Sequence, residues 1–189
     1  MKLLNKIRRI FERLFLGKTT EDYELQYLLD RGMKIGKNCH LYSINTIDHG
    51  LPHLISIGDN VTISTNVTIL THDASTNIVK CGTKLGRVII GNNVFIGTGS
   101  IVLCNTKIGN NVVVGAGSIV TKDLPSNGVY AGQPAKYICS IKEYKDKYEK
   151  LSKERPNFNV IRQWDTWQDA SDDERNIMKE MLKDGIGFF

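Results

Sequence analysis

The chain has 189 residues, of which 41% are hydrophobic and 24% are charged. This is the composition of an ordinary globular protein, so general disorder is excluded, and no apolar run approaches the ~20 residues of a membrane-spanning helix. The net charge of +5 favours an anionic ligand only weakly and gives no reason to expect nucleic acid.

The cysteines and the N-terminal sequence bear on the cellular compartment. The four cysteines lack any C-x-x-C spacing, which argues against a zinc ribbon, a redox pair or a disulfide scaffold. No small-residue cleavage site follows the short apolar run at 14–16, so a secretory signal is not expected. Both features favour a cytoplasmic protein with reduced thiols.

Residues 1–34 are predicted to form a helical segment. From Lys2 to Leu16 the apolar residues fall on one helical stripe and the basic residues on the other. Such a helix packs on the end of a domain or on a sister subunit, and the alternative is peripheral contact with an anionic membrane surface. A second helix is predicted from Thr20 to Arg31, with Gly32 ending it.

The middle of the chain repeats every six residues. β-Branched aliphatic residues recur at Ile90, Ile96, Val102, Ile108, Val114 and Val120. The same frame is found upstream at Ile57, Ile63 and Ile69, and in degenerate form at Ile35, Leu41 and Ile47. A period of six fits neither an amphipathic helix nor a long alternating strand. It predicts a chain that turns a corner every six residues, so that three faces form one coil of a parallel β-helix.

The extent of the repeat divides the chain into three parts: the helical segment at 1–34, the repeat region and a C-terminal tail. Residues 35–141 are predicted to form the β-helix domain, interrupted by a loop at 73–87 where the period lapses. Long irregular insertions on a rigid scaffold are places where functional sites tend to lie. Residues 142–189 are predicted to form a helical tail, whose last helix begins at a capping box made by Ser171 and Glu174.

The repeat resembles that of the hexapeptide-repeat acyltransferases. The likeness runs from Ile35 to Ile141 and is densest in IGDNVTI (57–63), ILTHDAS (69–75), IGNNVFIGTGSIVL (90–103), VGAGSIVTKDLP (114–125) and AGQPAK (131–136). Within the family, the galactoside and polysaccharide O-acetyltransferases are the most similar. The resemblance implies an all-β core in the form of a left-handed parallel β-helix, flanked by N-terminal and C-terminal helices. It also implies a homotrimer with pockets between neighbouring prisms.

The resemblance implies that His72 is the catalytic base. Acyl transfer from a thioester to a hydroxyl needs a group that takes a proton from the attacking oxygen and returns it to the leaving thiolate, and imidazole suits both steps. Asp73 is a weak candidate for orienting the imidazole, because adjacent residues in a strand point to opposite faces.

The donor contacts also follow from the resemblance. Acetyl-CoA is expected to lie along the later coils against Thr98, Ala116, Thr121, Lys122 and Lys136, with Lys136 meeting the nucleotide phosphates. The chain departs from the family at two positions. Cys139 occupies a second basic position, and Phe95 replaces the tryptophan often found beside the substrate, which keeps a stacking surface but loses an indole hydrogen bond.

Acceptor contacts are expected from Asn45 and Asp48, because the family lines that side of its pocket with such residues from the early coils. A metal site is the rival interpretation of this segment, since His49 and His53 lie close to Asp48 and His40 precedes them. The segment is irregular and shows no convergent triad of histidines, so no metal is expected.

Together these features predict an acetyl-CoA-dependent O-acetyltransferase that acts on a sugar hydroxyl, with a surface polysaccharide precursor as the suggested acceptor. Two alternatives stay open. The acceptor could be the amine of an amino sugar or an antibiotic, which needs the same base and donor. From a different class, the β-helix could be a scaffold without catalytic activity, because a repeat alone implies no chemistry.

Overall fold

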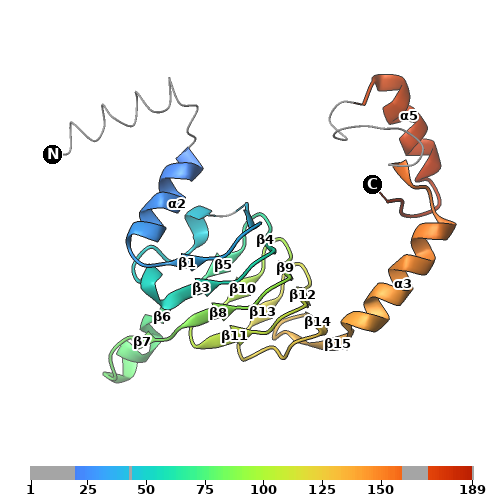
Figure 1. Ribbon diagram of the computed structural model, residues 1–189. Helices are drawn as coiled ribbons and strands as arrows, with labels where there is room; N and C mark the ends of the chain where they lie inside the picture. Colours follow the sequence, from blue (N-terminus) through green and yellow to red (C-terminus); the bar gives the residue numbers. More distant parts are fainter. Residues whose placement is uncertain (1–19, 43, 159–169, 189) are drawn as a thin grey trace. The chain divides into compact units, whose positions relative to one another are not determined.

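A computed structural model describes residues 20–42, 44–158 and 170–188 (Figure 1). The helix predicted at 2–16 lies outside these residues. The chain divides into two compact units, residues 1–141 and 142–189, which are taken in turn.

The first unit is a stack of coils whose strands pair in register across three sheets (Figure 1). One sheet contains β1 (Lys34–Ile35), β3 (Ile55–Ile57), β8 (Val88–Ile90) and β11 (Thr106–Ile108). Another contains β2 (His40–Leu41), β4 (Val61–Ile63), β9 (Val94–Ile96), β12 (Val112–Val114), β14 (Gly128–Ala131) and β15 (Lys136–Ser140). The third contains β5 (Thr68–Ile69), β10 (Ile101–Val102) and β13 (Ile119–Val120). All of these strands run parallel except β15, which pairs antiparallel with β14 and forms the edge of its sheet.

The strand register follows the six-residue repeat. The repeat positions pair one coil apart, as Ile90 with Ile108, Ile96 with Val114 and Val102 with Val120. Their side chains point inward, and those from Ile57 to Val120 are at most 4% exposed. Each coil therefore buries its apolar residues only against the coils above and below, and the parallel β-helix predicted from the period is confirmed.

One corner of the coils is built from asparagines. Asn60, Asn93, Asn111 and Asn127 each have a positive φ, between 54° and 64°, which asparagine tolerates better than most side chains. Their amides form a ladder, in which Nδ2 of Asn93 donates to Oδ1 of Asn111 at 2.9 Å and Nδ2 of Asn111 donates to Oδ1 of Asn127 at 2.8 Å. The repeated corner thus supplies both the turn and a contact between successive coils.

The helix α2 (Thr20–Asp30) lies at the start of the coils (Figure 1). Leu28 is fully buried and belongs to the same hydrophobic cluster as the coil interior. The helix ends where Gly32 takes a φ of +94°, as the sequence predicts. Two short 3-10 turns follow β2, η1 (Ile44–Thr46) and η2 (Pro52–Leu54).

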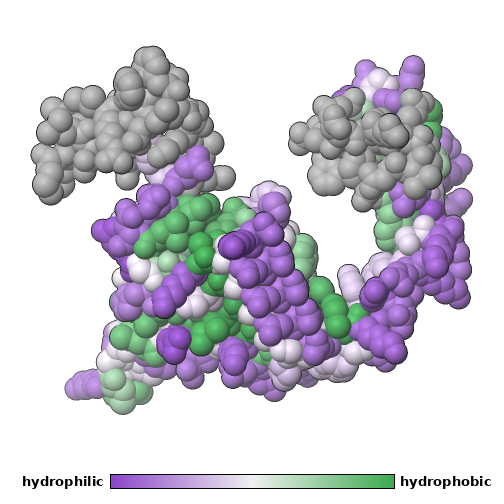
Figure 2. Space-filling model, in the orientation of Figure 1, coloured by the Kyte–Doolittle hydropathy of each residue, from purple (hydrophilic) through white to green (hydrophobic). Residues whose placement is uncertain are grey.

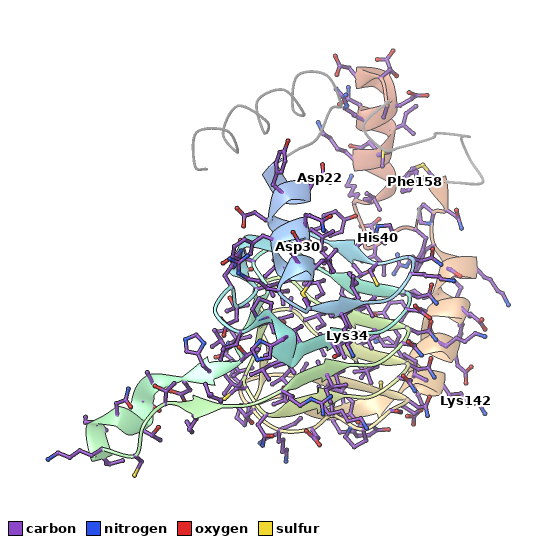
Figure 3. The ribbon with its side chains drawn as sticks, turned by 60° about the vertical axis from the view of Figure 1, so that its left-hand side comes forward. Asp22, Asp30, Lys34, His40, Lys142 and Phe158 are labelled. Atoms are coloured by element: carbon purple, nitrogen blue, oxygen red, sulfur yellow. The ribbon has the colours of Figure 1, made fainter. Side chains whose placement is uncertain are left out.

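The predicted interruption projects from the coils as a hairpin-like arm (Figures 1 and 3). It contains β6 (His72–Asp73), the 3-10 helix η3 (Ala74–Val79) and β7 (Lys84–Leu85), with β6 and β7 antiparallel. Ile57 on one side pairs directly with Ile90 on the other, 33 residues later, so the coil register continues across the arm.

The second unit contains α3 (Ile141–Glu154) and α5 (Asp172–Met181). The surface of α3 is hydrophilic (Figure 2). The capping box predicted at Ser171 and Glu174 is confirmed, because each residue's side chain accepts from the other's backbone N–H. None of the helices in the described part of the chain has the length and apolar character that crossing a bilayer requires.

Candidate active site

His72 begins the arm and is held by a buried carboxylate. Its Nδ1 lies 2.5 Å from Oδ2 of Asp48, whose side chain is 4% exposed, whereas the His72 side chain is 46% exposed. An ionised carboxylate only accepts, so the imidazole donates its Nδ1–H to Asp48 in this pair. Nε2 is then the nitrogen left to accept a proton.

The surroundings of Asp48 explain why it is ionised. Burial alone would raise the pKa of this carboxyl, but hydrogen bonds outweigh that effect and lower its pKa to about 2. Thr71 donates twice to Oδ2, from its hydroxyl at 2.5 Å and its backbone N–H at 3.0 Å, and the backbone N–H of Gly50 donates to Oδ1 at 2.8 Å. Asp48 therefore offers His72 a fixed negative charge.

The coil register brings Asp48 to His72. Ile47 bridges to Ile69 of the next coil, and the backbone N–H of Asp48 donates to the carbonyl of Ile69 at 2.9 Å. Asp48, the residue after Ile47, is therefore held against the end of β5, three residues before His72. The sequence predicts Asp48 as an acceptor contact and does not predict its bond to His72, which depends on the bridge between Ile47 and Ile69.

Asp73 does not contact the imidazole. Its carboxylate pairs with Nζ of Lys84 at 2.6 Å and accepts from the backbone N–H of Ser75 at 2.8 Å. These bonds, that to Lys84 first, hold the pKa of Asp73 below its usual range, and the same pair raises the pKa of Lys84. Because Asp73 and Lys84 are also partners in the β6–β7 pairing, the ion pair fixes the base of the arm beside His72. Sequence reasoning gave no signal for Lys84.

A cavity of about 570 Å³ opens beside His72, between the arm and a corner of the coils. The corner contributes Thr121, one of the predicted donor contacts, together with Cys104 and Asn105, which the sequence analysis did not single out. The remaining wall consists of Leu70, Asp73, Lys84, Leu85 and Leu103. The cavity therefore combines an imidazole, an ion pair and an apolar lining.

A second cavity has a volume of about 670 Å³. Lys122 lines it and directly follows Thr121 of the first cavity. Lys136 lines the same cavity, and Tyr130 and Tyr137 add aromatic rings whose centroids lie 5.7 Å apart. Three of the five predicted donor residues, Thr121, Lys122 and Lys136, thus line one or the other of these two cavities.

The other two predicted donor residues lie at a different corner. Thr98 and Ala116 occupy the turns after β9 and β12, where the backbone N–H of Gly117 donates to the carbonyl of Thr98 at 2.8 Å. Both side chains are exposed, and neither residue lines the two cavities described above. A single chain does not bring them to His72.

The remaining predicted contacts are spread out. Phe95 is 44% exposed on the outer face of β9, between Thr62 and Val113 of the neighbouring strands, and does not line either cavity. Asn45 falls in η1, and its side chain is not among those the structure describes.

The histidines of the rival metal interpretation have other surroundings. Nε2 of His49 lies 2.9 Å from Oε2 of Glu24 on α2, and Nδ1 lies 2.7 Å from the carbonyl oxygen of Ile47. Within residues 20–42, 44–158 and 170–188, no three His, Cys, Asp or Glu side chains converge as a metal site would require. His49 instead ties α2 to the segment that carries Asp48.

The sequence of the chain was compared with family models and with known proteins. Residues 87–122 match the model described as bacterial transferase hexapeptide (six repeats), and residues 55–71 match the hexapeptide repeat of succinyl-transferase. Protein CapG of Staphylococcus aureus is 42% identical over 146 residues, which are 75% of this chain and 83% of CapG. The galactoside O-acetyltransferase of Escherichia coli (strain K12) is 39% identical over 118 residues, 60% of this chain and 56% of that protein.

A solved structure agrees in fold. The hexapeptide-repeat acetyltransferase from Vibrio cholerae is 23% identical, with a TM-score of 0.53 over 66% of this chain and 81% of that one. This likeness concerns the coil architecture alone. From the repeat matches and the extent of the similarity to CapG, the chain belongs to the hexapeptide-repeat acyltransferase family.

Proposed function

We propose that the protein transfers the acetyl group of acetyl-CoA to a hydroxyl group of a sugar, with His72 as the general base. The observation that carries this proposal is the contact between His72 and Asp48. It fixes Nδ1 of an accessible imidazole to a buried carboxylate and leaves Nε2 to face a substrate at the wall of a cavity.

The chemistry follows from that arrangement. Nε2 takes the proton of the acceptor hydroxyl as its oxygen attacks the thioester carbonyl, and the proton passes to the sulfur as the carbon–sulfur bond breaks. Asp48 acts as a positioning residue. Its negative charge stabilises the imidazolium that exists between these two proton transfers and keeps the ring in one orientation.

The residues of the second cavity fit the donor. Coenzyme A carries phosphates at its nucleotide end, and Lys122 and Lys136 place two ammonium groups in one cavity. Thr121, which directly precedes Lys122, lines the cavity that holds His72. Lys122 and Lys136 would hold the phosphates, while the acetyl end would lie past Thr121 near the imidazole.

The positions of Thr98 and Ala116 support a homotrimer. They lie at another corner of the coils than His72, so a complete donor groove needs two chains. One chain would supply His72, Thr121, Lys122 and Lys136, and its neighbour would supply Thr98 and Ala116. We also propose that the coil winds left-handed, as the family resemblance implies. We further propose that the protein is cytoplasmic.

For the acceptor we propose a sugar unit of a surface polysaccharide precursor. The Escherichia coli relative is a galactoside O-acetyltransferase, which supports a sugar hydroxyl as the acceptor. Asn45 and Phe95 remain the proposed acceptor contacts. Both oxygens of Asp48 are occupied by donors within the chain, so we assign Asp48 to holding His72 and no longer to the acceptor.

The test is to mix the protein with acetyl-CoA and a panel of sugars and to follow the release of free thiol. On the true acceptor, His72→Ala should lower the rate by about two to four powers of ten while the protein stays folded, because this is the usual contribution of a general base. A folded His72→Ala variant that turns over at the parental rate would refute the assignment.

The products separate the alternatives. An ester that is cleaved by mild alkali, with the mass of one added acetyl group, identifies O-acetylation, whereas an alkali-stable product identifies transfer to an amine. A protein that shows no heat of binding with acetyl-CoA in calorimetry would instead be a scaffold.

A further inference from the structure

We propose that Thr71 is a positioning residue that sets how strongly Asp48 attracts the proton on His72. The kinetic part of this inference rests on the proposed function, because it takes His72 as the base. The structural part concerns only the three side chains and can be tested without any substrate.

The geometry concentrates three donors on one oxygen. Oδ2 of Asp48 accepts from Nδ1 of His72 at 2.5 Å, from the hydroxyl of Thr71 at 2.5 Å and from the backbone N–H of Thr71 at 3.0 Å. Thr71 has no exposed surface, so water does not compete for its hydroxyl. The imidazole and the hydroxyl therefore share the charge of the same oxygen.

This sharing has a predictable direction. A hydrogen bond to an ionised carboxylate spreads its charge and makes it a weaker partner for any other donor. The Thr71 hydroxyl weakens the pull of Asp48 on the imidazole, while the two Thr71 bonds also fix the direction of Oδ2. Removing only the hydroxyl should make Asp48 a stronger partner and His72 more basic.

The other titratable groups near the imidazole do not depend on Thr71. Asp73, Lys84 and Cys104 line the same cavity as His72, and Asp73 and Lys84 are paired with each other. Next to Asp48 in the chain, His49 pairs with Glu24 of α2. A change confined to Thr71 leaves all five of these groups in place.

The experiment follows the protonation of His72 directly. The imidazole Cε1–H signals of the four histidines are recorded by NMR across pH in the full-length protein, and the His72 signal is identified by its loss in His72→Gln. The main variant is Thr71→Val, which keeps the shape of threonine without its hydroxyl. Thr71→Ala is a second hydroxyl-free variant in case valine prevents folding, and Thr71→Ser restores the hydroxyl.

A matched control exists in the same coils. Thr106 is also buried, at 2% exposed, and its hydroxyl donates to the carbonyl of Leu103 at 2.8 Å, with no contact to Asp48 or His72 in the described structure. Thr106→Val likewise removes a buried threonine hydroxyl and its one hydrogen bond, here to a neutral carbonyl. It should lower stability without moving the midpoint of His72.

We expect Thr71→Val to raise the titration midpoint of His72 by about half a pH unit or more. Thr71→Ser should return the midpoint to the parental value. In an Asp48→Asn background, Thr71→Val should have no further effect, because the hydroxyl acts through the carboxylate. With a sugar acceptor, the acid limb of kcat/KM should move up in Thr71→Val by the same amount.

Each outcome bears on one proposal. A folded Thr71→Val or Thr71→Ala protein with an unchanged His72 midpoint overturns the inference, as does an equal shift in the Asp48→Asn background. Absence of acetyl transfer by the parent protein would refute the proposed function alone, since the NMR midpoint still reports on Thr71. A midpoint shift without a matching shift in kcat/KM would show that His72 is not the base of the reaction.

Discussion

Asp48 shows how one residue serves both stability and chemistry. Its side chain is buried, yet four hydrogen bonds keep it charged. Thr71 donates two of them, Gly50 one and His72 one. A carboxylate satisfied in this way stabilises the folded chain, and the same charge orients the imidazole. The two roles can be measured separately, because unfolding is followed without substrate and turnover is followed with it.

The pKa of Asp48 leads to a prediction about acid stability. Its folded pKa of about 2 lies below the ordinary value of 3.8, so its contribution is complete above pH 4 and is lost as the pH falls toward 2. This contribution should be on the order of 2 kcal/mol. Chemical denaturation of the parent and Asp48→Asn should therefore differ most at pH 6, with the gap closing between pH 4 and pH 2. A gap that does not vary with pH would contradict the assigned charge state.

The residues of the site differ in how far the sequence predicts them. His72 stands in a recognisable THDAS motif at the edge of the interrupted repeat, and the structure places it at the wall of a cavity. The contact of Asp48 with His72 depends on which coil stacks on which, whereas Lys84 reaches Asp73 through the pairing of β6 with β7. Asp48 lies in the irregular stretch between η1 and η2, where the six-residue frame is too degenerate to give that register.

At the scale of elements, the coils were predictable because each flat face of a coil turns one repeat residue inward, and these inward residues fix how neighbouring strands align. A branched aliphatic side chain every six residues can be buried only if each strand lies directly on its neighbour, which the pairing of Ile90 with Ile108 confirms. The arm was predictable only as an interruption. Its internal structure depends on the pairing of Asp73 with Lys84, two residues that carry no periodic signal.

The asparagine corner gives a prediction at this scale. Asn93 has a φ of 55°, and its amide donates to Asn111 and accepts from Asn60. Asn93→Gly keeps the turn and loses the ladder, which should cost about 1 kcal/mol, whereas Asn93→Ala also strains the backbone and should cost about 1 kcal/mol more. Chemical denaturation at one fixed protein concentration measures both. Equal losses would mean that the ladder alone, and not the backbone conformation, is what asparagine provides.

At the scale of the whole molecule, the proposed site is larger than one chain. The cavities of a single chain bring together His72, Thr121, Lys122 and Lys136, while Thr98 and Ala116 face outward from another corner. The family resemblance implies that Thr98, Ala116, Thr121, Lys122 and Lys136 contact the donor, but it does not say which of them come from the same chain. In the proposed trimer, the corner at which each residue lies decides which chain would supply it.

Mixed trimers test this division of the site. His72→Ala and Ala116→Trp should each be inactive, the second because a large ring blocks the proposed groove. Denaturing and refolding them together should restore part of the activity, because some interfaces then pair an intact His72 with an intact Ala116. Activity is measured as thiol release with the acceptor found for the parent.

The control for this experiment uses two changes at the same corner. His72→Ala mixed with Lys122→Glu should stay inactive, since no chain in that mixture carries both residues intact. Restoration by this second mixture, or none by the first, would contradict the proposed sharing of the site between neighbours.

Ile57 pairs with Ile90 although the arm lies between them in the sequence, and this bears on how the sequence of such a protein can change. Because the coils keep their register on both sides of the arm at 73–87, the arm can change in length and sequence without disturbing the pairing of the strands around it. Arms transplanted from relatives onto this chain should therefore fold in place, and the wall of the cavity beside His72 could be varied while the coils that carry Thr121, Lys122 and Lys136 stay the same.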